Sequence, residues 1–414
     1  MSPSRTAAAL LLSVAAVAVS APAHAHVHAP VESCLTSKLV SPRPKPSPLP
    51  TRDPAQPVIG GAALAAPGLV VPADATDLPK KVTARSWLVA DVDTGEVLGA
   101  CGAHEYGAPA SVQKLLLAAT LMDKLDAKQK VKVTNADLQY EPGSSAVGLV
   151  SGGSYTVRTL WLGLLLNSGN DAANVLARVG GGAAGVRGTM GEMNGLARKI
   201  GAWDTKAVTP SGLDGRGQVT SAYDLALIAR ICFANKDFLA YAQTPTTMIP
   251  AQKPRYAAFQ IQNDVSFTFA YQGALGGKTG FTDFARHTFV GAAQRNGKRL
   301  VVAVLGAENR PAKAWQQGAA LLDWGFETVG SEPVGKLVSP DEVAALAVPA
   351  AAAASATPAA PPTPKPAPVA LPRTSGVNWL PPWAVLVLVG VGIAVFTTIG
   401  IVQSRKNKRR RRRR

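Results

Sequence analysis

The segment His287–Ala307, HTFVGAAQRNGKRLVVAVLGA, decides the architecture that we expect for this chain. Two strand-like apolar runs flank Asn296-Gly297, and an Asn-Gly pair between such runs is the strongest short signal for a β-hairpin. A second hairpin is expected at Ser86–Ala100, where Asp93-Thr94-Gly95 separates two similar runs. Because the two hairpins are far apart in the chain, strands are expected at both ends of one globular block.

The region between the hairpins is predicted to be mostly helical, and one amphipathic helix follows the second hairpin. Strands at both ends with helices between them indicate an α/β (α+β) fold, in which an antiparallel sheet is completed late and carries helices on its faces. The block spans residues 82–330 and is long enough to bury a sizeable core. The expected helices cover Ala110–Leu125, Thr156–Val179, Arg187–Ile200, Ser221–Asn235 and residues 312–326.

The first and last segments of the chain are predicted to direct export and anchoring. Residues 1–25 have the layout of a signal peptide: an arginine, an apolar run, and small residues at the expected cleavage site. Residues 383–403 carry no charge and are long enough to span a bilayer, and the basic tail at 404–414 suits the cytoplasmic side. We therefore expect an exported protein held in the cell membrane by a C-terminal transmembrane helix, with the globular block outside.

Proline and alanine dominate the segments on either side of the block. They are predicted to be a linker at 26–81 and a stalk at 331–382. Within the stalk, Leu371-Pro372-Arg373-Thr374 followed by Ser375-Gly376 resembles a sortase signal, although the usual fifth residue is glycine. Covalent attachment to the cell wall is therefore a second form of anchoring that the sequence leaves open.

Charge and cysteine content exclude two classes of protein. The formal net charge is +17, but nine of the 43 basic residues lie within Arg405–Arg414. Aromatic residues make up 6% of the chain, and no basic face carries the stacking residues typical of nucleic-acid binding. The three cysteines, Cys34, Cys101 and Cys232, are too few for a disulfide framework; one pair could form, but the sequence does not assign it.

The first candidate for chemistry is Ser111-Val112-Gln113-Lys114, which follows Pro109 at the start of a predicted helix. Residues three apart share a helix face, so the hydroxyl of Ser111 and the amine of Lys114 are expected to be adjacent. A serine needs a base to become a nucleophile, and a lysine buried against Leu115–Leu117 could stay neutral for that role. Taken alone, the spacing also fits a helix cap followed by a surface lysine.

Two further motifs place polar groups in apolar or glycine-rich surroundings. Ser168-Gly169-Asn170 interrupts an apolar helix pattern, so its hydroxyl and carboxamide could face a cleft, although a simple interhelix turn also fits. Lys278-Thr279-Gly280 follows two other glycines just before a predicted strand. Its charge and hydroxyl suit a carboxylate ligand, although a flexible loop with a solvated lysine also fits.

The three motifs in this order, Ser-x-x-Lys, Ser-x-Asn and Lys-Thr-Gly, resemble the signature set of penicillin-binding proteins and serine β-lactamases. Over residues 82–330 the chain resembles the low-molecular-mass penicillin-binding proteins of the D-alanyl-D-alanine carboxypeptidase family. The strings MNGLARKIGAWDT, PSGLDGRGQVTSAYDLALIAR and KTGFTDFARHTFVGAA also read like this family. The resemblance implies a five-stranded antiparallel sheet packed between helices, with an additional helical subdomain.

The resemblance assigns catalysis to the first two motifs. It implies that Ser111 is the acylated nucleophile and that Lys114 is its general base. Ser168 would pass a proton toward the leaving group, and Asn170 would position the substrate. The implied reaction removes the terminal D-Ala of a peptidoglycan stem peptide through an acyl-enzyme, without a metal or other cofactor.

The third motif is implied to bind the substrate. Lys278 and Thr279 would hold the terminal carboxylate of D-Ala-D-Ala, and Gly280 and Phe281 would complete the binding residues. The backbone N–H groups of Ser111 and Phe281 would form the oxyanion hole. β-Lactam antibiotics would acylate the same serine and act as inhibitors.

Some features depart from the family, and alternatives remain open. Some relatives carry a β-rich domain after the catalytic one, where this chain has a stalk. They also have an arginine near the start of the last helix, whereas Arg310 and Lys313 here do not match it. A DD-endopeptidase would carry the same motifs. A β-lactamase would need a deacylating carboxylate that Glu192 does not supply at the right spacing, and an inactive wall-binding module would keep the fold alone.

Overall fold

The computed structural model describes residues 33–37, 49–53 and 56–346. A seven-stranded antiparallel sheet runs in the order β1-β3-β2-β10-β9-β8, and β11 also pairs with β3. Five of its strands are long, as the expected five-stranded sheet requires, and two are strands of two residues at the β3 side. The strands are β1 (Leu69–Val70), β2 (Ser86–Asp91), β3 (Glu96–Cys101), β8 (Ala274–Thr282), β9 (Arg286–Arg295), β10 (Lys298–Ala307) and β11 (Gly335–Lys336).

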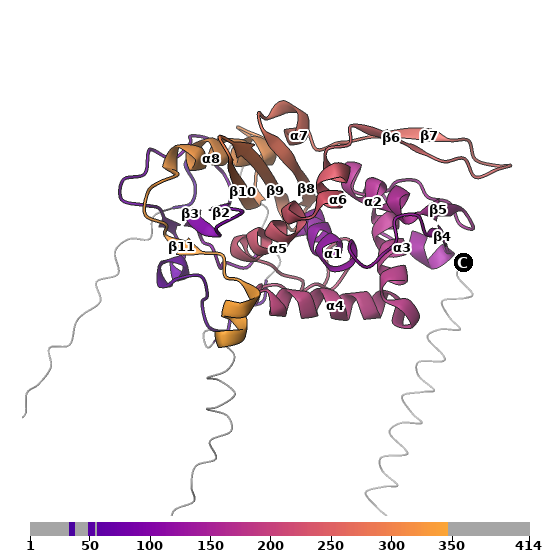
Figure 1. The fold of residues 1–414 in the computed structure, drawn as a ribbon, viewed down its shortest axis with the longest axis horizontal. Coiled ribbons are helices and arrows are strands. Elements are labelled where there is room, and N and C mark those ends of the chain that lie inside the picture. The colour runs from indigo at the N-terminus through magenta and orange to yellow at the C-terminus, as the bar shows by residue number, and fades with distance from the viewer. Residues whose placement is uncertain (1–32, 38–48, 54–55, 347–414) are drawn as a thin grey trace, which may run out of the picture. The chain divides into compact units, whose positions relative to one another are not determined.

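Both predicted hairpins form, and they join in the middle of the sheet. β2 pairs with β3, β9 pairs with β10 through Asn296-Gly297, and β10 closes the sheet against β2 with Val301 opposite Ala90. Both faces of these strands are buried, which explains why they read as apolar runs without alternation. The predicted antiparallel α+β architecture is therefore confirmed (Figure 1).

Helices cover both faces of the sheet. On one face α8 (Ala314–Thr328) packs on alternate residues such as Val302 and Phe289, while the residues between them, such as Val301, face α5 (Ala222–Ala234). Figure 1 shows α8 above the sheet and α5 below it. Behind α5 lies α1 (Lys114–Leu121), in which seven of eight residues are buried. A helix that is apolar all round belongs in the core, so a polar residue on this helix is buried as well.

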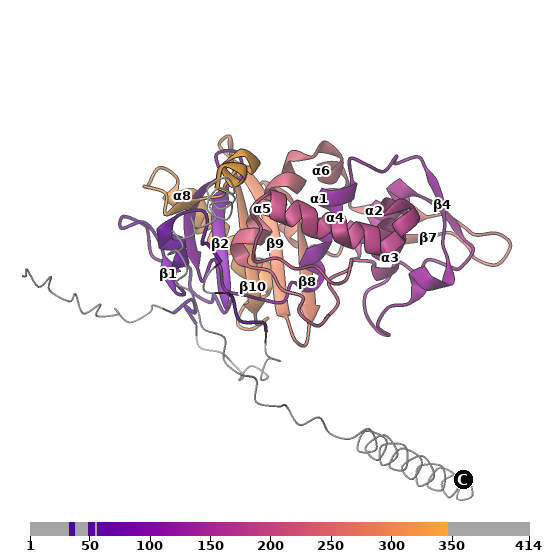
Figure 2. The same ribbon diagram turned by 90° about the horizontal axis from the view of Figure 1, so that it is seen from below.

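The predicted helical subdomain lies at one end of the molecule (Figure 2). The single helix expected over Thr156–Val179 is instead two helices, because Asn167–Gly169 form a turn between them. Two small two-stranded sheets that the sequence did not predict, β4 with β5 and β6 with β7, lie at this end. The elements are α2 (Val157–Leu166), α3 (Asn170–Gly180), α4 (Gly185–Lys199), β4 (Lys130–Lys132), β5 (Ser154–Thr156), β6 (Thr246–Ile249) and β7 (Phe259–Gln262); α6 (Lys236–Ala242) and α7 (Phe267–Ala270) connect this end to the sheet.

The packed unit is longer at both ends than the predicted block 82–330. Leu64 and Leu337, in segments predicted as linker and stalk, are fully buried in the same core. Cys34 forms a disulfide with Cys101 of β3, and Cys232 is a free, buried thiol. Proline and alanine content alone predicted a linker at 26–81, but scattered apolar side chains and one cysteine are enough to hold its described part on the sheet.

The predicted signal peptide, the transmembrane segment at 383–403, the basic tail and the sortase-like string lie outside the described residues. Within the described part of the chain, no helix combines the length and apolar character needed to cross a membrane.

Candidate active site

The three sequence motifs meet in one cavity of about 400 Å³ at the edge of the sheet, between β8 and the helical end. The cavity receives residues from three stretches that are more than 50 residues apart in the sequence. All the predicted site residues except Lys114, which lies directly beneath Ser111, line it: Ser111, Ser168, Asn170, Lys278, Thr279, Gly280 and Phe281.

Ser111 and Lys114 are adjacent because the chain there forms a 3-10 helix, η2 (Ala110–Gln113), that leads into α1. In this helix, side chains three residues apart stand directly above one another. The Nζ atom of Lys114 lies 2.8 Å from the Oγ atom of Ser111. The same Nζ atom lies 2.8 Å from Oδ1 of Asn170 and 2.8 Å from the backbone oxygen of Ser211. Three polar contacts therefore surround one amine.

The amine of Lys114 lies inside the protein because α1 is a core helix. The side chain is fully buried, and this burial holds the pKa of Lys114 well below its ordinary value. The positive charge of Lys278 lowers this pKa further, and the carboxylate of Asp171 acts in the opposite direction. The alternative interpretation, a helix cap followed by a surface lysine, is therefore excluded.

Glycines allow the strand β8 to approach the backbone of Ser111 closely. A Cβ atom on Gly280 would lie 2.7 Å from the backbone nitrogen of Ser111 and 2.4 Å from Oγ1 of Thr288. Thr288 in turn donates a hydrogen bond of 2.9 Å to the backbone oxygen of Pro109. Ala110, just before the serine, has a φ of +48°, which is uncommon for a residue with a Cβ atom. The backbone on both sides of Ser111 is thus held in one specific geometry.

The Lys-Thr-Gly motif was expected just before a strand, but it lies inside β8, the edge strand. Glycines are depleted in strands, and the three glycines here obscured the strand pattern. A Cβ atom at any of these three glycines, Gly276, Gly277 or Gly280, would lie less than 3.0 Å from a neighbouring atom. The strand keeps glycine at these positions because only a residue without a side chain allows the neighbouring atoms to lie so close to its backbone.

Ser168 lies in the turn between α2 and α3. Its φ is +63°, and its buried Oγ atom has no hydrogen-bond partner among the described residues. An unpartnered buried hydroxyl and a strained backbone are both costly, and such costs are typical of functional sites. Ser168 therefore faces the cavity with a hydroxyl that is free to bond a ligand.

Asn170 begins α3 and connects two walls of the cavity. Its Oδ1 atom contacts Lys114, and its Nδ2 group donates a hydrogen bond of 2.9 Å to the Oγ atom of Ser144. The next residue, Asp171, is fully buried and accepts hydrogen bonds of 2.9, 2.9 and 3.0 Å from the backbone N–H groups of residues 147–149. The Asn-Asp pair thus holds the loop 143–149 as a wall of the cavity. Sequence reasoning missed this loop, since only the tertiary structure shows what Asp171 binds.

Lys278 is also fully buried, and its Nζ group donates a hydrogen bond of 2.8 Å to the backbone oxygen of Thr279. Burial lowers the pKa of Lys278 to about 7, while the charge of Asp264 acts against this shift. A lysine that is only partly protonated near neutral pH gains its full charge when an anion binds beside it. The surroundings of Lys278 therefore fit a carboxylate-binding group, and the solvated loop lysine is excluded.

The cavity contains other residues that the sequence did not single out. Lys313, at the start of α8, lines the cavity, whereas Arg310 does not. His287 stacks on Phe281 with ring centroids 4.4 Å apart, and Phe281 is 48% exposed at the rim. The place of Lys313 at the start of the last helix is the signal that indicates it, although a lysine does not match the arginine of relatives.

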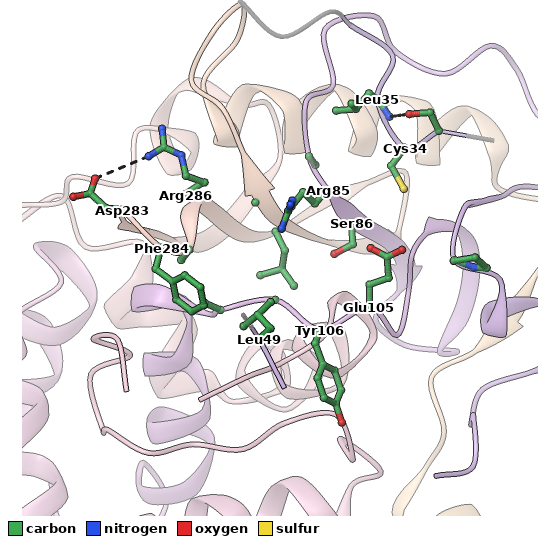
Figure 3. Close-up of a pocket in the computed structure, with 18 residues that line it drawn as sticks. Cys34, Leu35, Leu49, Arg85, Ser86, Glu105, Tyr106, Asp283, Phe284 and Arg286 are labelled. Atoms are coloured by element: carbon green, nitrogen blue, oxygen red, sulfur yellow. Dashed lines mark hydrogen bonds and ion pairs between the residues drawn. The ribbon is translucent and has the colours of Figure 1, made fainter. Parts of the chain in front are cut away.

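A second cavity, of about 560 Å³, is lined in part by residues 105–108, which precede Ser111 in the sequence (Figure 3). Arg85 and Glu105 face it, and the turn that carries Phe284 and Arg286 closes one side. It contains none of the motif residues. Because Leu35 and Leu49, which line it, border the segment 38–48 outside the described residues, this cavity carries no functional assignment. Within the described residues, no cluster of three or more His, Cys, Asp or Glu side chains could hold a metal ion.

Comparison with known proteins agrees with the site. The sequence model of the D-alanyl-D-alanine carboxypeptidases, Peptidase S11, matches residues 73–309. The D-alanyl-D-alanine carboxypeptidase DacB2 of Mycobacterium tuberculosis is 43% identical over 273 residues, which cover 65% of this chain and 90% of that protein. The enzyme DacF of Bacillus subtilis is 28% identical over 61% of this chain and 64% of its own length.

Solved structures give the same result. A crystal structure of a D-alanyl-D-alanine carboxypeptidase from Mycobacterium tuberculosis superimposes with a TM-score of 0.60 and 41% identity, over 64% of this chain and 99% of that one. A DD-transpeptidase from Streptomyces superimposes with a TM-score of 0.58 and 27% identity, over 61% of this chain and all of that one. Fold, motifs and relatives together define a serine peptidase of the penicillin-binding class. The chain belongs to the D-alanyl-D-alanine carboxypeptidase family.

Proposed function

We propose that this protein removes the terminal D-alanine of peptidoglycan stem peptides, with Ser111 as the nucleophile and Lys114 as its base. One observation carries the assignment: the buried amine of Lys114 lies 2.8 Å from Oγ of Ser111. Its other two contacts, Oδ1 of Asn170 and the backbone oxygen of Ser211, can only accept hydrogen bonds. A neutral amine donates its two hydrogens to these two acceptors. Its lone pair then points toward the hydroxyl proton of Ser111.

Acylation follows from this arrangement. Lys114 takes the hydroxyl proton while Oγ of Ser111 attacks the carbonyl carbon of the penultimate D-Ala. The backbone N–H of Ser111, beside the strand β8, stabilises the charge that develops on the carbonyl oxygen, together with the N–H of Phe281. The peptide bond then breaks, and the leaving amine takes a proton that is passed by the free hydroxyl of Ser168. The products are D-alanine and an ester on Ser111.

Deacylation reverses these proton transfers with water in place of D-alanine. Water attacks the ester carbonyl, Lys114 accepts a proton from it, and the bond to Oγ of Ser111 breaks with return of a proton to the serine. The donors and acceptors are those of this chain, so the cycle is complete without a metal or other cofactor. A β-lactam presents a strained amide to the same hydroxyl and would remain as a penicilloyl ester.

The terminal carboxylate of the substrate is assigned to the β8 side of the cavity. Lys278 offers a charge and Thr279 a hydroxyl, and Lys313 brings a second cation from the start of α8. A charged hydrogen bond of this kind contributes more binding free energy than a neutral one. The match to the D-alanyl-D-alanine carboxypeptidase family over residues 73–309 favours carboxypeptidase action. DD-endopeptidase action on a cross-linked peptide shares the acylation chemistry and is the second candidate.

The experiment is D-alanine release from diacyl-L-Lys-D-Ala-D-Ala, with and without benzylpenicillin. We expect release that penicillin abolishes and that Ser111→Ala lowers by about 10⁴-fold or more. Thermal unfolding of this variant should stay close to that of the parent protein, since only one oxygen atom is lost. Release by Ser111→Ala at the parent rate would refute the assignment. A penicilloyl adduct on Ser111 without D-alanine release would favour the endopeptidase.

We also propose that the chain is exported and anchored in the cell membrane with its catalytic part outside. The signal-peptide layout of residues 1–25 and the apolar segment 383–403 support this proposal. Attachment to the wall after cleavage at Thr374 is the competing form of anchoring. The mass of the mature C-terminal peptide distinguishes them: an end at Thr374 would overturn the membrane anchor.

A further inference from the structure

We propose that the β6–β7 hairpin, residues 246–262, extends the catalytic cleft and binds the glycan strand that carries the stem peptide. This inference rests on the proposed function, because it requires a peptidoglycan substrate. It adds a second contact with the polymer, separate from the cavity in which the peptide is cut.

The hairpin begins where the wall of the cleft ends. Asn263 donates a backbone hydrogen bond of 2.8 Å to Pro245 and closes the base of the hairpin. The next residue, Asp264, donates one of 2.8 Å to the backbone oxygen of Leu166. Asp264 and Leu166 both line the catalytic cavity. A polymer that leaves the cavity on this side therefore meets the hairpin next.

The hairpin is held firmly on the helical end of the molecule. On its inner face Ile249 and Ile261 are buried near α2. Near its tip, the side chain of Gln252 bonds both the backbone nitrogen and the backbone oxygen of Ser154, at 2.8 and 3.1 Å. Figure 1 shows the hairpin projecting from the body of the domain past α2. A projecting element that is fastened at both its base and its tip has the rigidity that a binding surface needs.

The outer face of the hairpin combines apolar and amide groups. In the paired strands Thr246 lies opposite Gln262 and Met248 opposite Gln260, so these four side chains share the face opposite to Ile249 and Ile261. This face exposes Met248 (55%) beside the amides of Gln260 and Gln262, and Tyr256 (51%) is exposed nearer the tip of the hairpin. Exposed Met and Tyr next to amide groups suit a ligand with apolar faces and hydrogen-bonding edges, which describes a sugar ring.

Charge at the tip agrees with a wall polymer. Lys253 and Arg255 are exposed there. Neighbouring stem peptides on a glycan strand end in carboxylates, which these cations would attract. A membrane surface is the other ligand that basic and aromatic residues could bind. On the outer face Met248 lies among Thr246, Gln260 and Gln262, and this mixed surface suits a sugar polymer better than lipid. The exposed residues 256–259 make a membrane contact the alternative that the test must separate.

The test uses the full chain in detergent and the double variant Met248→Ser/Tyr256→Ala. D-Alanine release is measured on diacyl-L-Lys-D-Ala-D-Ala and on insoluble peptidoglycan. We expect kcat/KM on the short peptide to stay within about twofold, and kcat/KM on the polymer to fall by about tenfold, the effect of a modest binding contact. The control is Val186→Ser on α4, which removes an exposed apolar side chain (37%) away from the hairpin and should change neither rate.

Direct binding completes the test. Pelleting with peptidoglycan from which an amidase has removed the stem peptides should retain the parent protein and release the double variant. Equal pelleting of both, or an equal loss of rate on both substrates, would overturn the proposal. Loss of binding to anionic phospholipid vesicles with unchanged binding to stripped glycan would also overturn it and indicate a membrane contact. Failure of the parent protein on the short peptide would instead count against the proposed activity itself.

Discussion

The catalytic cavity has a fully buried lysine at each of two walls, Lys114 beneath Ser111 and Lys278 in β8, and the two lysines have different surroundings. On the helical wall, Lys114 has three polar contacts at 2.8 Å, from a hydroxyl, a carboxamide and a backbone oxygen. On the strand wall, Lys278 bonds one backbone oxygen, with glycines before and after it in β8. The first amine is enclosed by protein, whereas the second keeps bonding capacity for a ligand.

This difference explains how one residue type can serve two purposes in one site. A lysine with two obligate acceptors and a serine hydroxyl is positioned for proton transfer even before substrate binds. A lysine with unused donors gains its charge and its remaining hydrogen bonds only when a carboxylate arrives. The same burial that makes the first a base makes the second sensitive to its ligand. The predictions below test this contrast, from the largest expected effect to the smallest.

Among these variants, replacement of Lys114 should cause the largest loss of activity. Lys114→Met keeps the side-chain volume but removes the base, so the rate of acylation by penicillin should fall by about 10³-fold or more. Stability should change much less, because the cost of burying the amine is removed together with its hydrogen bonds. Labelling with a fluorescent penicillin measures the acylation rate. The control is Lys124→Met, which changes an exposed lysine just beyond the end of α1 and should acylate normally. Parent-like acylation by Lys114→Met would remove the proposed base.

Gly280→Ala should have the next largest effect. The added Cβ atom would meet the backbone nitrogen of Ser111 and Oγ1 of Thr288, so β8 must move away from the nucleophile. A displacement near 1 Å at a reacting group costs about 10²-fold in rate, and we expect that loss in kcat/KM. Gly195→Ala on α4 meets nothing within 4 Å and should be neutral or stabilising by about 0.5–1 kcal/mol. If both alanine variants kept parent activity, the close approach of β8 would not matter for catalysis.

The role of Lys278 should be visible in the pH dependence of KM. The pKa of Lys278 is about 7 without ligand, so the lysine is charged below that pH and neutral above it. A carboxylate binds the charged form, and KM should therefore stay flat below pH 7 and rise by up to about tenfold per pH unit above it. Lys278→Gln should raise KM at low pH and flatten this alkaline rise. A KM that climbs equally in the variant would assign the pH dependence to another group.

Much of the fold could be predicted from local patterns. The Asn296-Gly297 hairpin, the hairpin at Asp93–Gly95 and the amphipathic helix that became α8 all rest on interactions between near neighbours in the chain. The break between α2 and α3 was marked by three poor helix formers at residues 168–170, although the single helix predicted across it was wrong. The strand β8 was missed, because its glycines serve the site rather than the strand.

The sequence predicts which residues belong to the candidate site but not how they are arranged in space. Three short motifs contain seven of the eight residues, since each pairs polar groups with an unusual setting, and the family resemblance adds Phe281. The wall formed by the loop 143–149, and the place of Lys313 in the cavity, depend on contacts with distant residues. The Cys34–Cys101 disulfide is a similar case, because only the folded chain brings those two cysteines together.

The sequence by itself determined the chemical groups, the hairpins and most of the helices of this protein, because these follow from residue type and from neighbours along the chain. The tertiary structure decided that α1 lies in the core, which buries Lys114 and lowers its pKa, and that β8 comes close enough to Ser111 to exclude any side chain at residue 280. Desolvation and close approach are properties of the packed interior. These two effects make a site from a serine, an asparagine and two lysines that the sequence shows only as motifs.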